Sequence, residues 1–166
     1  NFSMSNERII HPLKPVYDAS SKVLILGSFP SVKSREEGFY YANKTNRFWK
    51  ILEEIYDEKI EDKEAFAHKH HIALWDVIES CKIHGSSDSS ITKVKVNDIF
   101  SLVKDTQIKV IFTTGQKASS IYDKYILDLP VPHISLPSSS SANASMKLQD
   151  LINKYYVIKE YTDEKD

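Results

Sequence analysis

The segment VLILGSFPS, residues 23–31, decides the fold class that we predict for this chain. Its first four residues are apolar and partly β-branched, which is typical of a strand buried on both faces of a parallel sheet. The run ends at Gly27, and a polar loop follows it. In open α/β sheets, ligands bind just beyond the carboxyl ends of such strands. We therefore expect a functional site at Gly27 and in the loop that follows it.

Strand and helix patterns alternate along the rest of the chain. Strands are predicted at Lys22 to Leu26, Ile72 to Trp75, Lys109 to Thr113 and His133 to Leu136. Helices are predicted at Asn46 to Tyr56, Lys63 to His70, Val96 to Lys104, Gln116 to Tyr125 and Ala144 to Tyr155. This alternation indicates a parallel sheet covered on both faces. The predicted fold is α/β, a three-layer α/β/α sandwich around a central, mainly parallel four-stranded sheet.

Length and composition describe one ordinary globular domain over residues 1–166, with residues 1–9 and 160–166 expected to be frayed. No apolar stretch is long enough to cross a membrane. The single cysteine, Cys81, excludes an internal disulfide and a four-cysteine cluster, so we expect a reduced, cytoplasmic setting. We also expect a monomer. The net charge of −1 gives no global sign of nucleic-acid binding, although a local basic patch is enough to attract phosphates.

Several polar or aromatic residues follow the predicted strands, and each has two interpretations. Asp76 follows a strand directly and is either a hydrogen-bond acceptor for a ring N–H or a turn cap. Tyr41 belongs to the aromatic segment 39–41, which either stacks on a flat base or packs in the core. Asn46 is either a helix N-cap or a catalytic group, and the cap is favoured locally. The serines at 138–141 either contact phosphates or form a flexible connection.

The remaining motifs do not indicate a metal or phosphate site. His68, His70 and His71 crowd one helix end without a companion carboxylate pattern, and a solvated face is the better interpretation. The segment TTGQK, residues 113–117, lacks the glycine spacing of a phosphate-binding loop. We therefore expect neither a metal nor a redox cofactor.

Five short segments, taken in order, resemble the uracil-DNA glycosylase superfamily, and more narrowly its hypoxanthine- (deoxyinosine-) DNA glycosylase branch. They are GSFPS at 27–31, FYY at 39–41, NRFWK at 46–50, ALWDV at 73–77 and LPSSS at 136–140. The resemblance runs from about residue 10 to residue 155. It implies a monofunctional enzyme that extrudes a deaminated base from double- or single-stranded DNA and hydrolyses its N-glycosidic bond.

The same resemblance assigns roles to individual residues. The water-positioning residue of the superfamily's first motif falls on Phe29, which has no polar group, and the branch relies instead on the residue at Asn46 as the catalytic group. Tyr41 is the base-stacking aromatic, and Asp76 reads the base by accepting N1–H of hypoxanthine or N3–H of uracil. The floor of the pocket comprises Gly27, Ser28 and Phe29. The expected DNA contacts are Ser31, Ser34, Ser138, Ser139, Ser140 and Asn143.

This chain also departs from the pattern of its relatives. Leu136 stands where many of them carry a His or Asn, so no histidine is available there to stabilise a departing base. The segments 42–45 (ANKT) and 113–115 (TTG) differ from the usual sequences, which affects the shape of the pocket. Three alternatives stay open: a uracil-preferring glycosylase, a non-catalytic nucleic-acid-binding module, which Phe29 favours, and an unrelated α/β protein.

Overall fold

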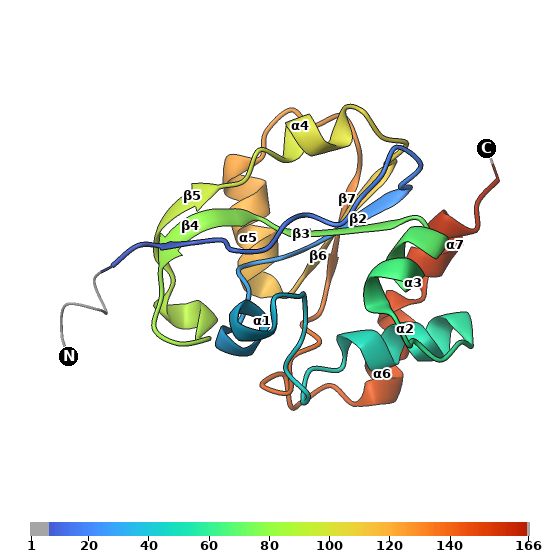
Figure 1. Ribbon diagram of the computed structural model, residues 1–166, viewed down its shortest axis with the longest axis horizontal. Helices are drawn as coiled ribbons and strands as arrows, with labels where there is room; N and C mark the ends of the chain where they lie inside the picture. Colours follow the sequence, from blue (N-terminus) through green and yellow to red (C-terminus); the bar gives the residue numbers. More distant parts are fainter. Residues whose placement is uncertain (1–6, 166) are drawn as a thin grey trace.

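A computed structural model describes residues 7–165, and its centre is a parallel sheet of four strands (Figure 1). The strands are β2 (Val23–Gly27), β3 (Ile72–Asp76), β6 (Val110–Thr114) and β7 (His133–Leu136). They lie in the order β3-β2-β6-β7, and every neighbouring pair is parallel. The predicted four-stranded sheet is therefore confirmed, and all of its strands end at one edge.

The sheet is buried on both faces, as the apolar run in β2 predicts. Val23 and Ile25 belong to one core cluster, whereas Leu24 and Leu26 belong to a second cluster, because successive side chains of a strand point to opposite faces. The first face is covered by α2 (Phe48–Tyr56), α3 (Lys63–Lys69), α6 (Leu148–Tyr155) and α7 (Val157–Thr162). The second is covered by α4 (Ile99–Val103) and α5 (Gln116–Tyr125), which confirms the three layers (Figure 1).

A second sheet, which the sequence did not predict, joins the layer that contains α4 and α5. It consists of β1 (Ile9–Ile10), β4 (Ile78–Lys82) and β5 (Thr92–Val96), antiparallel and in the order β1-β4-β5. The prediction of a helix from Val96 to Lys104 is wrong at its start, because Val96 ends β5. Helix α4 begins at Ile99, and the Asp98 side chain caps it by accepting the Ser101 N–H.

Other helix ends and the chain ends also differ from expectation. Helix α2 begins at Phe48 rather than at residue 46, and α6 begins at Leu148 rather than at residue 144. Ile9 pairs with Cys81 of β4, and α7 extends to Thr162, so the expectation of frayed ends is wrong for Ile9 and for residues 160–162. Residues 1–6 and 166 lie outside the described residues. Within the described part of the chain, no helix is long and apolar enough to span a membrane.

Candidate active site

The carboxyl ends of the four parallel strands form the floor of a cavity of about 170 Å³. Gly27, Asp76 and Thr114 are the last residues of β2, β3 and β6, and Ser138 follows β7 closely. The walls come from α1 (Val32–Glu37), the loop before α2, the serine loop after β7 and the β4–β5 connection. The cavity is lined by Gly27, Ser28, Phe29, Pro30, Ser31, Ser34, Tyr40, Tyr41, Asn43, Thr45, Asn46, Asp76, Ser86, Asp88, Thr114 and Ser138 to Ser141. The expected site residues are brought together here, apart from Asn143.

Gly27 leaves the space that the Asp76 carboxylate occupies. A Cβ atom at Gly27 would lie 2.6 Å from Asp76 Oδ1, closer than packed atoms approach, and 3.2 Å from the Tyr41 hydroxyl, which is also a tight contact. The sheet pairing also continues past the strand ends, because the Gly27 and Ser28 carbonyls accept the N–H groups of Val77 and Ile78 at 2.8 and 3.1 Å. The floor of the cavity is therefore a direct extension of the rigid sheet.

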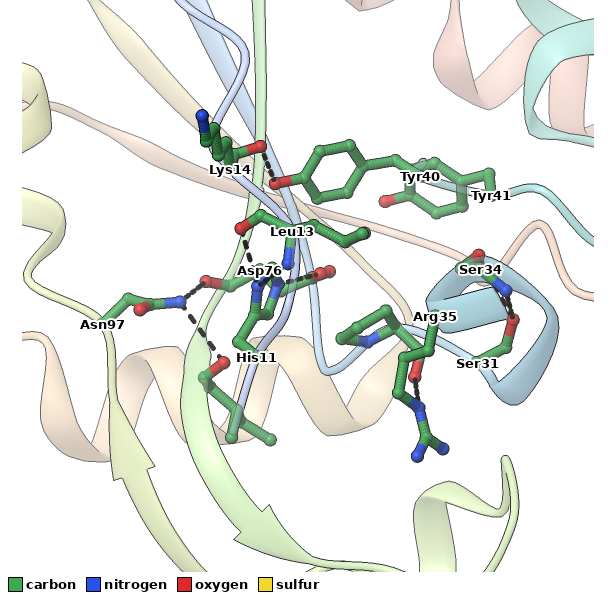
Figure 2. Close-up of polar contacts among 12 residues, drawn as sticks. His11, Leu13, Lys14, Ser31, Ser34, Arg35, Tyr40, Tyr41, Asp76 and Asn97 are labelled. Atoms are coloured by element: carbon green, nitrogen blue, oxygen red, sulfur yellow. Dashed lines mark hydrogen bonds and ion pairs between the residues drawn. The ribbon is translucent and has the colours of Figure 1, made fainter. Parts of the chain in front are cut away.

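Asp76 is held from one side by His11, a residue that no sequence pattern singled out (Figure 2). His11 Nε2 lies 2.7 Å from Asp76 Oδ2, and the two side chains are only 3% and 5% exposed. The other ring nitrogen, Nδ1, lies within hydrogen-bond distance of the backbone of Leu13. Behind the strand, the Asn97 side-chain amide donates to the backbone carbonyls of Asp76 and Ile78 at 2.9 and 3.2 Å. Asp76 Oδ1 is left to face the cavity.

Tyr41 is fixed as a flat wall of the cavity. Its ring stacks on Phe48 with centroids 3.9 Å apart and 14° between the planes. Its hydroxyl lies 2.8 Å from Thr114 Oγ1, at the end of β6. The backbone of Tyr41 has φ 54°, a left-handed conformation that is uncommon outside glycine and that the surroundings must hold in place. Burial and the nearby Asp76 carboxylate raise the pKa of Tyr41 well above its ordinary value, so the hydroxyl stays neutral.

The Asn46 side chain accepts the first N–H of α2 and lines the cavity. Its Oδ1 accepts the Phe48 N–H at 2.9 Å and the Ser139 hydroxyl at 2.8 Å. Because a backbone N–H can only donate, the atom it contacts must be the amide oxygen. The N-cap position of α2 is Arg47, so the prediction of Asn46 as the N-cap is wrong by one residue, although its side chain accepts the first N–H of the helix. Both acceptor positions of Oδ1 are used, and the Asn46 amide nitrogen remains for a ligand.

Arg47 fastens the serine loop to the start of α2. Its guanidinium donates to the backbone carbonyls of Ser139, Ser140, Asn143 and Met146. Ser139 is 2% exposed, so its hydroxyl serves Asn46 rather than an outside molecule. Asn143 does not line the cavity, and its side-chain amide instead donates to the Ser138 carbonyl at 3.0 Å. The loop is therefore an ordered wall and not the flexible connection that its composition allowed.

The segment after β2 also folds around internal hydrogen bonds. Ser31 caps α1 by accepting the Ser34 N–H, and Ser34 Oγ accepts the Ala42 N–H at 3.1 Å. Ser34 is 2% exposed, which makes it a support of the cavity wall. Phe29 is packed between the His11 ring, whose centroid is 5.8 Å away, and the Arg35 guanidinium, 5.6 Å from the ring centroid. Phe29 thus holds His11 in place from the side.

Asp88 is the second site residue that sequence analysis missed. It lies in the one-turn helix η2 (Asp88–Ser90) of the β4–β5 connection, within a serine-rich segment that gave no signal beyond a loop. Its Oδ1 accepts the Ser28 hydroxyl at 2.9 Å. Partial desolvation at the cavity wall raises the pKa of Asp88 above its ordinary value, while the Ser28 hydrogen bond and Lys117 lower it. Among the described residues, no group of three or more metal-ligating side chains occurs.

Comparisons with known proteins agree with this fold and identify the family. The sequence model of the uracil DNA glycosylase superfamily matches residues 14–157. A protein of Methanosarcina acetivorans named hypoxanthine DNA glycosylase is 36% identical over 135 residues, which cover 77% of this chain and 84% of the relative. A protein of the same name from Methanosarcina barkeri is 31% identical over 136 residues, covering 78% and 85%.

A solved structure of another protein has the same fold as this chain. The solution NMR structure of a candidate uracil DNA glycosylase from Methanosarcina acetivorans superimposes with a TM-score of 0.80 at 28% identity. The alignment covers 94% of this chain and all of the other. With the family match extending over most of the sequence, this chain belongs to the uracil DNA glycosylase superfamily.

Proposed function

We propose that this protein is a DNA glycosylase that hydrolyses the N-glycosidic bond of a deaminated base, with hypoxanthine as the preferred base. The observation that carries the proposal is the Asp76 carboxylate on the cavity floor. His11 contacts its Oδ2, whereas Oδ1 occupies the space that Gly27 leaves, in the wall of the cavity that Asp76 lines. A single fixed acceptor at the bottom of a cavity selects a ring that presents an N–H there.

Hypoxanthine and adenine differ at the atom that would meet Asp76. Hypoxanthine carries a hydrogen on N1 and donates it to Oδ1, whereas adenine presents a lone pair at N1. A carboxylate that loses its donor and faces a lone pair is disfavoured by about 1–3 kcal/mol or more. The contact therefore rejects the normal base, which is discrimination by an unfavourable interaction with the wrong ligand.

Tyr41 supplies the platform for the extruded base. Phe48 covers one face of the Tyr41 ring, so the other face is the one that a base can cover. Stacking of a base on an aromatic side chain contributes roughly 1–3 kcal/mol. That gain offsets part of the few kcal/mol needed to unstack and extrude a nucleotide, a cost that is lower for a mispaired, deaminated base.

The remaining residues orient the DNA and the departing base. The Asn46 amide nitrogen donates toward the reacting nucleotide, and backbone N–H groups near Ser28 stabilise negative charge that develops on the base. Ser31, Ser138 and Ser140 at the cavity wall contact the DNA backbone, while Ser34, Ser139 and Asn143 act by holding that wall. Among the residues that line the cavity there is no lysine, so the proposed route is direct hydrolysis rather than a Schiff base. All of the groups that this proposed reaction uses belong to a single chain.

A panel of oligonucleotides tests this function. Each strand carries one deoxyinosine, deoxyuridine, deoxyxanthosine or deoxyadenosine, and abasic sites are detected by alkaline cleavage. The proposal predicts release from deoxyinosine and none from deoxyadenosine. Preferential release from deoxyuridine would instead establish the uracil-preferring alternative, because N3–H of uracil can also donate to Asp76. DNA binding without release from any strand would establish a non-catalytic module.

The variant Asp76→Asn sharpens the test. An amide at this position can donate as well as accept, so the variant should lose preference for hypoxanthine over adenine. Unchanged preference would show that Asp76 supports the fold only.

A further inference from the structure

The β4–β5 connection brings a second carboxylate, Asp88, to the cavity. The connection is anchored beside α1, because Arg35 donates to the Gly85 carbonyl at 2.6 Å and the Val32 N–H donates to Ser86 Oγ at 2.8 Å. Asp88 Oδ1 accepts the hydroxyl of Ser28, a residue that directly follows β2 and is 8% exposed. Among the described residues, Oδ2 of Asp88 has no hydrogen-bond or ion-pair partner. Asp88 thus lines the cavity with one carboxylate oxygen that is not engaged by the described residues.

The two carboxylates of the cavity lie at different depths. Asp76 ends a central strand and is 4% exposed, whereas Asp88 belongs to an exposed loop at the mouth. In a purine nucleotide, N1 and the glycosidic nitrogen N9 lie on opposite sides of the base. A hypoxanthine that donates N1–H to Asp76 therefore has its N9, and the sugar carbon C1′ bonded to it, toward the mouth. Asp88, the more exposed of the two carboxylates, is then expected on the side of the sugar.

Hydrolysis at that carbon needs a group that accepts a proton from water. Asn46 cannot supply it, because its Oδ1 already accepts from Phe48 and Ser139 and its amide nitrogen only donates. The Tyr41 hydroxyl is neutral and is engaged with Thr114. A carboxylate is a suitable base, and its efficiency improves as its pKa approaches the working pH. The free oxygen of Asp88 is the acceptor that the described cavity offers at its mouth.

We propose that Asp88 is the catalytic general base of the reaction, an inference that rests on the proposed glycosylase function. In the step, the C1′–N9 bond breaks and its electron pair leaves with the base. The water oxygen forms the new bond to C1′, and the water proton passes to Asp88 Oδ2. That proton then goes to solvent, the anionic base takes up a proton from solvent, and the products are free hypoxanthine and an abasic sugar. The negative charge of Asp88 also stabilises the positive charge that develops on the sugar.

The variant Asp88→Asn tests this role, because it keeps the size of the side chain and removes the base. Single-turnover release of hypoxanthine should fall by roughly 10²-fold or more. Binding of deoxyinosine DNA should be unchanged or tighter, since a negative charge near the phosphates is lost. Asp88→Glu should restore part of the rate. The matched control is Ser89→Ala. Within residues 7–165 its exposed hydroxyl bonds only to Ser87 in the same loop, and its loss should leave the rate unchanged.

A pH profile separates a general base from a structural residue. Charged or titratable groups that act on Asp88 are Lys117 of α5, which lowers its pKa, and Asp76 of β3, which raises it; the Tyr41 hydroxyl near it is neutral. Because the Ser28 hydrogen bond also lowers the pKa of Asp88, Ser28→Ala should move the acid limb of the rate profile to higher pH. Asp88→Asn should abolish that limb.

The outcomes distinguish this inference from the proposed function. If the natural protein releases no base from the panel, both are wrong. If it releases hypoxanthine and folded Asp88→Asn retains its rate within threefold, the glycosylase stands and Asp88 is not its base. If Asp88→Asn fails to fold, judged by circular dichroism, an unshifted acid limb in Ser28→Ala overturns the inference.

Discussion

His11 Nε2 lies 2.7 Å from Asp76 Oδ2, although 65 residues separate the two in the chain. The contact depends on the strand β1, which pairs with β4 and carries the chain to His11. Because both side chains are almost fully buried, the carboxylate has one orientation, with its second oxygen toward the cavity. Asp76, the residue proposed to read the base, is thus aligned by a segment far from it in sequence.

Replacing His11 should therefore impair base recognition. In His11→Phe the Asp76 carboxylate loses a hydrogen bond, and because a hydrogen bond to a carboxylate is worth about 1.5–3 kcal/mol, kcat/KM on deoxyinosine should fall at least 10-fold. His11→Gln retains a donor and should lose less. The control is His68→Gln, which alters a partly exposed histidine that pairs with Asp18. Kinetics and melting temperatures of the three variants check this, and an active His11→Phe would contradict it.

Gly27→Ala should abolish activity by displacing Asp76. The added Cβ would lie 2.6 Å from Oδ1, so the carboxylate or the sheet must shift. The matched control is Gly38→Ala, which strains a residue with φ 78° but meets no atom within 4 Å. We expect both variants to melt at lower temperature and only Gly27→Ala to lose base release. Equal loss of activity in the two would attribute the effect to stability alone.

Asn46→Ala should lose most of its base release while keeping the fold. The variant leaves the Phe48 N–H without its acceptor, which costs about 1 kcal/mol of stability, as typical for a lost helix cap. Ser139→Ala, which removes only one donor to Asn46, should retain much more activity. Rates below saturation and denaturant unfolding separate the two effects. Near-normal base release by Asn46→Ala would show that Asn46 is not a catalytic residue.

Arg47→Lys should loosen the serine loop without changing its composition. A lysine cannot reproduce the planar set of donors that contacts four carbonyls. The KM for DNA should rise several-fold with a smaller change in kcat, because the wall that meets the DNA is less ordered. Lys50→Arg on the surface of α2 is the control. An unchanged KM would show that loop order is irrelevant to DNA binding.

Those parts of the fold that have strong local patterns were predictable from the sequence. The apolar runs of β2 and β6 form central strands with parallel neighbours, and their sequences predict buried parallel strands. Strands β4 and β5 mix polar and apolar residues, since one face of their sheet is open, and the pattern near Val96 was mistaken for the start of a helix. The short β1 owes its existence to pairing with β4, and its two residues carry no pattern of their own.

The site was predictable where residues directly follow strands. Asp76 and the Gly27 loop were placed by the rule that parallel strands end at one edge. The roles of Tyr41 and Asn46 in the site were predicted only from the family resemblance, because the local sequence favours a core aromatic and a helix cap. His11 and Asp88 come from segments with no chemical signature, and only the tertiary structure brings them to the cavity. Contacts of this kind are set by packing and not by spacing.

The stacking of Tyr41 on Phe48 affects the free energy with which a damaged nucleotide is recognised in DNA. The Tyr41 ring already packs on Phe48 with centroids 3.9 Å apart, and its hydroxyl is hydrogen-bonded to Thr114. In the proposed complex, Tyr41 therefore has little conformational entropy left to lose when a base stacks on it. Because the stacking platform is preorganised, the free energy of recognition depends mainly on the cost of unstacking and extruding the nucleotide from the DNA. Weakly paired nucleotides are then captured fastest, and the strength of the base pair becomes the first filter through which a lesion is found.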